Sequence, residues 1–296
     1  MTDRLSPEAD YSEWIGRSET LVDVASRSAV VGLNAVLDHP LDVRDADNAK
    51  LFPLGHWLQF TPTAPMSELG PDGHPKLGDF MPPLDLPRRM WAGSKIEFHA
   101  PISVGQQLER VTTIESITPK TGSTGRLCFV VLRHEISADG VPALTDRHTI
   151  VYREAVEVDP NAAPSPRPAR ADGPAPEGWD WVREQRPIET TLFRYSALTF
   201  NTHRIHYDWP YVTTVEGYPG LVVHGPLMAT YIVDGFLQAH PDAELKTFEF
   251  SARAPIFAGE QIHVVGRWDG SGREELALIS PEGTVAISAR ISYRTA

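Results

Sequence analysis

Titratable residues gather in one short stretch, between residues 193 and 225. Three of the 11 histidines lie there, as His203, His206 and His224, and Asp208 follows His206 closely. Histidine changes its charge near neutral pH and is the commonest metal ligand, so the stretch suits either proton transfer or metal binding. A His-x-x-His pair with an aspartate is a common spacing and dictates no further ligand. We therefore predict acid–base chemistry and no metal.

Other kinds of chemistry lack a motif. The sequence has no Gly-x-Ser-x-Gly turn for a serine nucleophile, no Gly-x-Gly-x-x-Gly and no Gly-Lys-Ser/Thr. Nucleotide hydrolysis and nicotinamide chemistry are therefore not supported, and we expect no cofactor.

The residues of the stretch suggest a base and an electrophile-binding end. His206 suits the base, because imidazole exchanges protons near neutrality. Pro226 favours the first position of a helix, which would leave Gly225 at the N-cap with its N–H exposed. Such an N–H can stabilise a carbonyl oxygen that gains negative charge. The alternative is that His206 and His224 are only hydrogen-bonded loop and core residues.

The elements that must position these residues follow from hydrophobic periodicity. Apolar residues at helical spacing predict helices over 19–37 and 227–239. Alternating or apolar runs separated by Asp-Gly and Glu-Gly turns predict antiparallel strands over 111–117, 127–136, 145–152, 261–267, 275–279 and 284–293. The expected class is α+β, with sheets that wrap helices.

The chain also repeats itself. A Pro-Ile-x-x-Gly-x-Gln pattern at 101–107 recurs at 255–261, and Ile-x-Tyr-Arg endings close both halves. Between the halves, residues 159–178 contain six prolines and five alanines, which is typical of an extended linker. We predict modules over 1–158 and 179–296, joined by this linker.

Composition limits the binding partners and the cellular location that we expect. With 27 basic and 39 acidic residues the net charge is −12, which argues against binding to nucleic acid or to an anionic membrane. The single cysteine, Cys128, lies in an apolar run and excludes an internal disulfide. A polar N-terminus and the lack of an apolar run of about 18 residues predict a cytoplasmic protein without a signal peptide or membrane span.

The stretch resembles the signature of MaoC-like hydratases and dehydratases, which act on acyl thioesters. Ile205, His206 and Asp208, followed by His224 and Gly225, match the family pattern Asp-x-Asn-Pro-(Ile/Leu)-His-x-Asp and its later His-Gly. The resemblance implies a double hotdog fold, two antiparallel sheets each wrapping a helix, in a homodimer. It also implies that the substrate is a thioester of CoA or of acyl carrier protein.

Three positions depart from the family pattern. Asn201 stands at the catalytic aspartate, His203 at the asparagine and Arg204 at the proline. An amide orients water but is not a base, so His206 carries the proton transfer alone or with His203 or Asp208. This version of the signature is similar to a subgroup that includes mesaconyl-CoA and itaconyl-CoA hydratases, which implies a short branched or dicarboxylic substrate.

The remaining candidate residues would bind substrate. Arg204 could hold a distal carboxylate, or it could be a surface residue or pair with Asp208. His203 and His224 flank the predicted base. Arg88 and Arg89 are candidates for the CoA phosphates, with a solvated basic pair as the alternative.

The first half lacks the catalytic residues: its matching region, 51–57, has a histidine but no equivalent acid–base set. The resemblance implies that this half is degenerate and shapes an acyl tunnel. We therefore predict reversible hydration of a 2-enoyl thioester, with Asn201, His206 and Gly225 as catalytic residues. A hotdog thioesterase and a non-catalytic acyl-CoA-binding protein are the alternatives.

Overall fold

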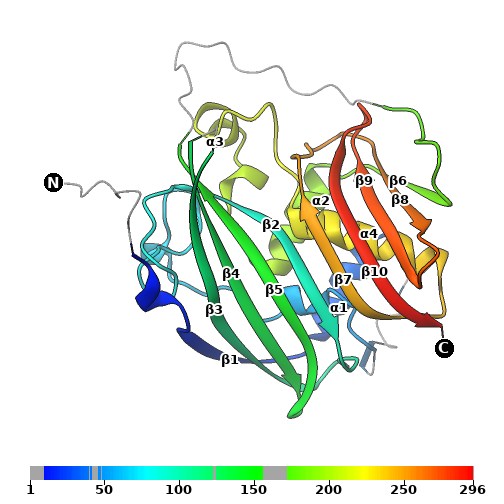
Figure 1. Ribbon diagram of the computed structural model, residues 1–296, viewed down its shortest axis with the longest axis horizontal. Helices are drawn as coiled ribbons and strands as arrows, with labels where there is room; N and C mark the ends of the chain where they lie inside the picture. Colours follow the sequence, from blue (N-terminus) through cyan, green and yellow to red (C-terminus); the bar gives the residue numbers. More distant parts are fainter. Residues whose placement is uncertain are drawn as a thin grey trace.

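The strands form one antiparallel sheet of ten, in the order β1-β3-β4-β5-β2-β7-β10-β9-β8-β6 (Figure 1). The computed structural model describes residues 10–39, 41, 46–47, 49–122, 125–155 and 172–295. The strands are β1 Ser18–Val24, β2 Arg88–Phe98, β3 Gln107–Gly122, β4 Gly125–Ala138, β5 Val141–Arg153, β6 Trp181–Gln185, β7 Ala243–Ala252, β8 Ile262–Trp268, β9 Arg273–Ile279 and β10 Val285–Thr295. The helices are α1 Arg27–Val36, α2 Glu189–Thr199, α3 Trp209–Thr214 and α4 Gly225–Ala239, with 3-10 turns η1 Ser12–Trp14, η3 Gly55–Leu58, η4 Met66–Glu68 and η5 Arg204–His206.

Two sets of five strands share one topology. Strands β1–β5 and strands β6–β10 each follow the order first, third, fourth, fifth, second, and the two sets meet at β2 and β7. The joint is close: a Cβ at Gly93 would lie 2.3 Å from the Phe250 carbonyl oxygen, so only glycine fits there. The predicted α+β architecture is confirmed, and the two sets of strands form one continuous sheet.

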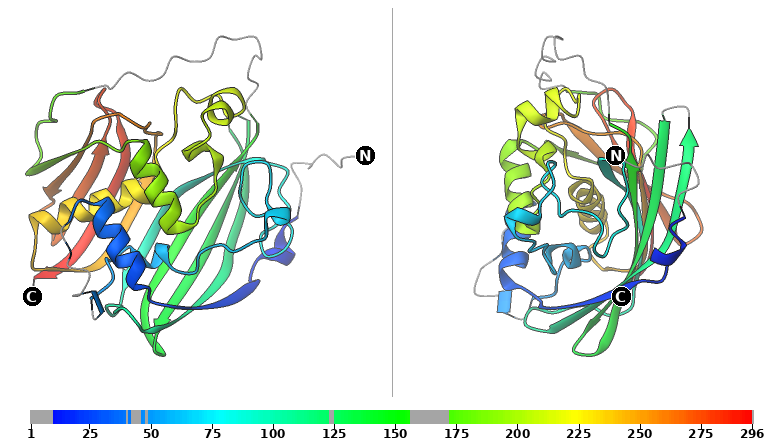
Figure 2. Two further views of the ribbon diagram at one scale, coloured as in Figure 1. Left: turned by 180° about the vertical axis from the view of Figure 1, so that it is seen from behind. Right: turned by 90° about the vertical axis from the view of Figure 1, so that its left-hand side faces the viewer.

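Helix α4 crosses the concave face of the second set of strands (Figure 2). Its residues Leu227, Ile232 and Phe236 are fully buried and belong to the main hydrophobic core together with Phe248 and Ile287 of the sheet. Because the helix is buried on all sides, it holds the residues at its N-terminal end in place. The helix predicted over 227–239 is confirmed.

The two sets differ in what precedes their second strand. The Leu51 N–H donates to the Ile102 carbonyl at 2.8 Å, and the Val223 N–H donates to the Ile256 carbonyl at the same distance. After this shared connection the C-terminal half has α4, whereas the N-terminal half has only the short turn η3. Helix α1 packs instead against α2.

The helix predicted over 19–37 is wrong in its first part. Residues 18–24 form the edge strand β1, paired with β3, and α1 begins only at Arg27. The hydroxyl of Ser26 accepts the Ala29 N–H at 3.4 Å and caps the helix there. Backbone pairing with β3 thus outweighs the helical spacing of the apolar residues before the cap.

Other sequence predictions concern the linker, the cysteine and the membrane. Of the predicted linker 159–178, residues 159–171 lie outside the described residues. Cys128 is buried in β4, and burial raises its pKa to about 11, which suits a core residue and not a nucleophile. In the part of the chain that the structure describes, no helix has the length and apolar character needed to cross a membrane.

Candidate active site

His206 lies in the turn η5, between α2 and α3, and its orientation is fixed by one hydrogen bond. Its Nδ1 lies 2.7 Å from the carbonyl oxygen of Val222. A carbonyl can only accept, so Nδ1 carries the proton and Nε2 keeps its lone pair. The ring therefore presents a free Nε2 that can take a proton from water.

His224 supports this ring from the other side. The two imidazoles stack with centroids 3.6 Å apart and planes 17° apart, and His224 Nε2 shares a hydrogen bond of 2.8 Å with the Ser196 hydroxyl on α2. His224 is completely buried and His206 is 7% exposed. The pair is held between α2 and the start of α4, so His206 has little freedom to turn.

Burial keeps the three histidines neutral. It lowers the pKa of His206 to about 4, against the raising effect of the Val222 hydrogen bond. Burial also lowers the pKa of His203 and of His224, helped for both by the neighbouring His206. At neutral pH each ring is an uncharged imidazole, the form that a general base requires.

Helix α4 begins one residue earlier than predicted. The N-cap is His224, whose carbonyl accepts the Met228 N–H at 3.0 Å, so Gly225 is the first helical residue and Pro226 the second. As the first residue, Gly225 has no carbonyl one turn earlier to receive its N–H. A Cβ on Gly225 would lie 3.8 Å from Trp91 Cβ of β2. Gly225 thus lies where the two halves meet.

A loop of the N-terminal half completes the site, and sequence reasoning missed it. The Arg204 N–H donates to the Asp72 carbonyl at 2.9 Å, and Gly73 lies against the Thr202 carbonyl so closely that a Cβ would be 2.0 Å away. His74 follows, with its Nδ1 2.8 Å from Asp72 Oδ2 and its ring 4.2 Å from the His203 ring. These residues precede the signature by more than 100 positions, so no spacing could have linked them to it.

Asn201 has a structural task as well as a place in the site. Its side-chain oxygen accepts the backbone N–H of His203 at 2.9 Å and fixes the turn that follows α2. The side chain is half-buried, and its amide nitrogen is left to donate a hydrogen bond.

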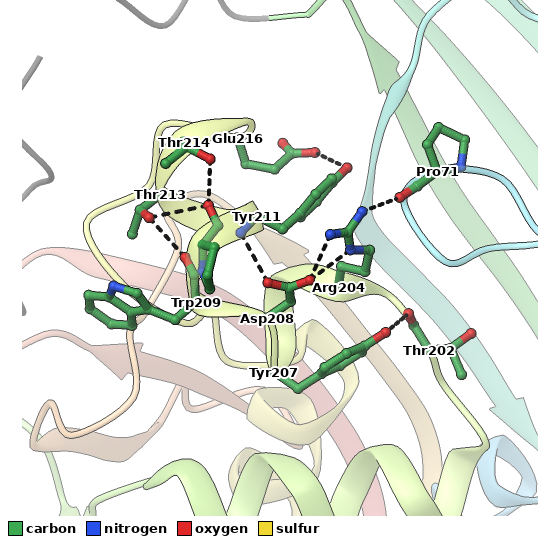
Figure 3. Close-up of polar contacts among 11 residues, drawn as sticks. Pro71, Thr202, Arg204, Tyr207, Asp208, Trp209, Tyr211, Thr213, Thr214 and Glu216 are labelled. Atoms are coloured by element: carbon green, nitrogen blue, oxygen red, sulfur yellow. Dashed lines mark hydrogen bonds and ion pairs between the residues drawn. The ribbon is translucent and has the colours of Figure 1, made fainter. Parts of the chain in front are cut away.

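Arg204 and Asp208 contact each other (Figure 3). The guanidinium lies 2.7 Å from Asp208 Oδ2, donates to the Pro71 carbonyl at 3.0 Å and sits 4.2 Å from the centre of the Tyr211 ring. Asp208 also caps α3 by accepting the Tyr211 N–H. Of the alternatives that the sequence left open for Arg204, the structure has the ion pair with Asp208.

The two neighbouring arginines at the start of β2 differ in their partners. Arg88 pairs with Glu216 at 2.6 Å and lies 5.2 Å from the centre of the Tyr218 ring. Arg89 faces the histidines: its positive charge contributes to the lowered pKa of His74 and of His203, after the larger effect of burial.

One group of residues in the described part of the chain has a donor set for a metal. The ligand atoms of Asp72, His74 and His203 lie within 4.8 Å of one another. This group shares only His203 with the His203, His206 and Asp208 spacing that was considered from the sequence. Neutral imidazoles and a carboxylate are ligands of divalent transition metals.

Comparisons with known proteins identify the family of the chain. Residues 54–258 match the family described as "Hydroxyacyl-thioester dehydratase type 2". The chain is 40% identical to a mesaconyl-C(4)-CoA hydratase of Chloroflexus aurantiacus over 96% of its own length and 98% of that protein. A solved MaoC-like dehydratase of Phytophthora capsici superposes with a TM-score of 0.64 at 15% identity, covering 97% of this chain and all of that one.

The fold itself has a described parallel. A Mycobacterium tuberculosis protein reported to have a double hotdog fold superposes with a TM-score of 0.56 at 13% identity, covering 94% of this chain and 96% of that one. The predicted double hotdog is thereby confirmed. With the family match and the near-complete alignment to a hydratase, the chain belongs to the hydroxyacyl-thioester dehydratase type 2 family of MaoC-like hydro-lyases.

Proposed function

We propose that this protein reversibly adds water to the double bond of a short dicarboxylic 2-enoyl-CoA of the mesaconyl-C4-CoA type. The observation that carries the proposal is a neutral His206, whose Nδ1 is bonded to the Val222 carbonyl so that Nε2 keeps its lone pair, together with the Gly225 N–H at the first position of α4. Hydration of an enoyl thioester needs a base for water and a donor for the thioester oxygen, and these two groups supply them. The similarity to the Chloroflexus hydratase supports the substrate class.

The proposed reaction uses one proton shuttle. His206 Nε2 accepts a proton from water, and the water oxygen bonds to the β-carbon. The electron pair of the double bond moves through the α-carbon to the thioester oxygen, where the Gly225 N–H donates a hydrogen bond to the developing negative charge. His206 then returns its proton to the α-carbon. One water is added in total, and dehydration is the reverse.

The other residues position the reactants. The Asn201 amide orients the water, and the backbone turn that it fixes places His203 beside His206. His224 holds the His206 ring in place through their stacking contact. Asp208 takes no part in proton transfer in this scheme, because its carboxylate is held by Arg204 and the start of α3.

The test is an assay of the full-length protein with mesaconyl-C4-CoA and crotonyl-CoA. Loss of the enoyl-thioester absorbance is followed together with trapping of free thiol. We expect the absorbance to fall without release of thiol. Thiol release would show a thioesterase instead, and binding of both thioesters without turnover would show an acyl-CoA-binding protein.

We further propose that the protein works in the cytoplasm, as a homodimer and without a cofactor. The expectation for the cofactor follows from the scheme above, in which the chain's own groups perform each step. The homodimer follows from the family resemblance alone. CoA is the proposed carrier because the Chloroflexus relative is named for a CoA ester.

A further inference from the structure

We propose that Arg89 binds the free carboxylate of a dicarboxylic acyl-CoA, so that the N-terminal half selects the substrate for which the C-terminal half performs the chemistry. This inference rests on the proposed function. It assigns to Arg89 a different ligand from the CoA phosphates that the sequence suggested, and it assigns carboxylate binding to a residue other than Arg204.

The strand register places Arg89 beside the reacting groups. In the pairing of β2 with β5, Arg89 lies opposite Tyr152 and Trp91 lies opposite Ile150, so both side chains share one face of the sheet. Trp91 lies against Gly225. Residues two apart on a strand are separated by about 7 Å, so Arg89 lies within one side-chain length of the start of α4.

The neighbours of Arg89 come from both halves of the molecule. Its positive charge contributes to the lowered pKa of His74 and His203 in the active site, and of His148 on β5. His148 itself stacks on Trp91 with ring centroids 3.9 Å apart. Arg89 therefore lies on the inner face of the N-terminal strands, opposite Tyr152 of β5, where its charge acts on histidines of both halves.

The guanidinium of Arg89 is half-buried, and among the described residues it forms no ion pair with a carboxylate. In the described ranges of the chain, no carboxylate lies within the 4.0 Å of an ion pair from its guanidinium. The nearby carboxylate of Asp72 is instead bonded to His74. Removing a cation from water without a counter-ion is costly, so a site of this kind favours an anionic ligand.

The other two candidate arginines are already occupied. Arg88 pairs with Glu216 at 2.6 Å, and Arg204 pairs with Asp208 at 2.7 Å. A substrate carboxylate would have to displace an intramolecular carboxylate from either of them. Arg89 can accept the same ligand without breaking an ion pair.

The internal repeat shows that the strand itself does not require this charge. The two Pro-Ile-x-x-Gly-x-Gln segments are 154 residues apart, and the same offset takes Arg89 to Ala243 and Trp91 to Leu245. Both counterparts pack against the hydrophobic core of the C-terminal half. A charged residue thus stands where the related strand has an apolar one.

The structure of the substrate decides which of its anionic groups, the free carboxylate or the CoA phosphates, can reach Arg89. In mesaconyl-C4-CoA the free carboxylate is attached to the β-carbon, the atom that receives water. It must therefore lie next to the group that activates the water. The CoA phosphates are separated from the thioester by the whole pantetheine arm, so a residue beside the reacting carbons cannot hold them. A guanidinium can bind a carboxylate with two parallel hydrogen bonds.

The experiment compares mesaconyl-C4-CoA with 3-methylcrotonyl-CoA and crotonyl-CoA. The second thioester has a methyl group in place of the carboxylate, and the third carries only one methyl group and one hydrogen on its β-carbon. Values of kcat/KM are measured for the wild-type protein and for Arg89→Gln, Arg89→Lys and Arg204→Gln, with the melting temperature of each variant as a check of folding.

We expect Arg89→Gln to lower kcat/KM for mesaconyl-C4-CoA by about a hundredfold or more, and to change the values for the two uncharged thioesters much less. Arg89→Lys keeps a cation and loses the planar fork, so it should lose less, again only for the dicarboxylic thioester. If Arg89→Gln fails to fold, this lysine variant decides the matter. Arg204→Gln should affect all three thioesters alike.

Three results would overturn the inference. Equal losses on all three thioesters in both Arg89 variants would give Arg89 a structural or CoA-binding role. A selective loss in Arg204→Gln alone would move carboxylate binding to that residue. A wild-type protein that hydrates crotonyl-CoA but not mesaconyl-C4-CoA would refute the dicarboxylic substrate while leaving the hydratase reaction standing, and no hydration of either would refute the proposed function itself.

Discussion

At the scale of single residues, the carbonyl of Val222 decides which nitrogen of His206 is available. It accepts the Nδ1 proton and leaves Nε2 for water. His206 and Gly225 are candidates that the sequence offers by itself, because they lie in one signature. Asp72, His74 and Trp91 are not, because folding alone brings them to it. For Arg204 the sequence left several alternatives open, and only the structure shows its contact with Asp208.

The pH dependence of the reaction belongs to this scale. A base works in its neutral form, and burial lowers the pKa of His206 to about 4. Because a lowered pKa extends the neutral form to lower pH, kcat/KM should stay level as the pH falls from 7 to about 5 and decrease only near pH 4. Initial rates across this range test it, with samples returned to neutral pH to confirm that the protein is intact. A decrease centred at about 6.5, the value of an exposed histidine, would contradict the prediction.

At the scale of elements, the proposed reaction takes its donor to the thioester oxygen from the start of α4. His224 has an extended backbone, with φ −59° and ψ 130°, which is the conformation preferred before proline. Gly225→Pro should therefore keep the helix and remove only the N–H. We expect kcat to fall by about a hundredfold or more, the usual effect of losing one oxyanion donor.

Gly225→Ala is the matched control. It keeps the N–H, and its Cβ would meet only Trp91, at an ordinary contact distance of 3.8 Å. We expect kcat within a few-fold of wild type. Comparable kcat values in the proline and alanine variants would show that the Gly225 N–H does not stabilise the reaction.

At the scale of the whole molecule, two copies of one topology have become unequal. Periodicity was enough to predict the antiparallel strands, because these depend on local sequence. It did not predict β1, whose residues have helical spacing but pair with the edge of β3. Nor could it predict that loop 70–74 of the first half docks on the signature of the second. We propose that the modules at 1–158 and 179–296 are domains of one duplicated fold whose shared junction is the active site.

The most direct test of the central claim is the hydration rate of His206→Asn. The asparagine amide can still donate to the Val222 carbonyl, as Nδ1 does, but has no group at the position of Nε2. With mesaconyl-C4-CoA, or with crotonyl-CoA, we predict that kcat falls at least about a hundredfold while the melting temperature changes little. A variant that hydrates both thioesters within a few-fold of the wild-type rate would contradict His206 as the base.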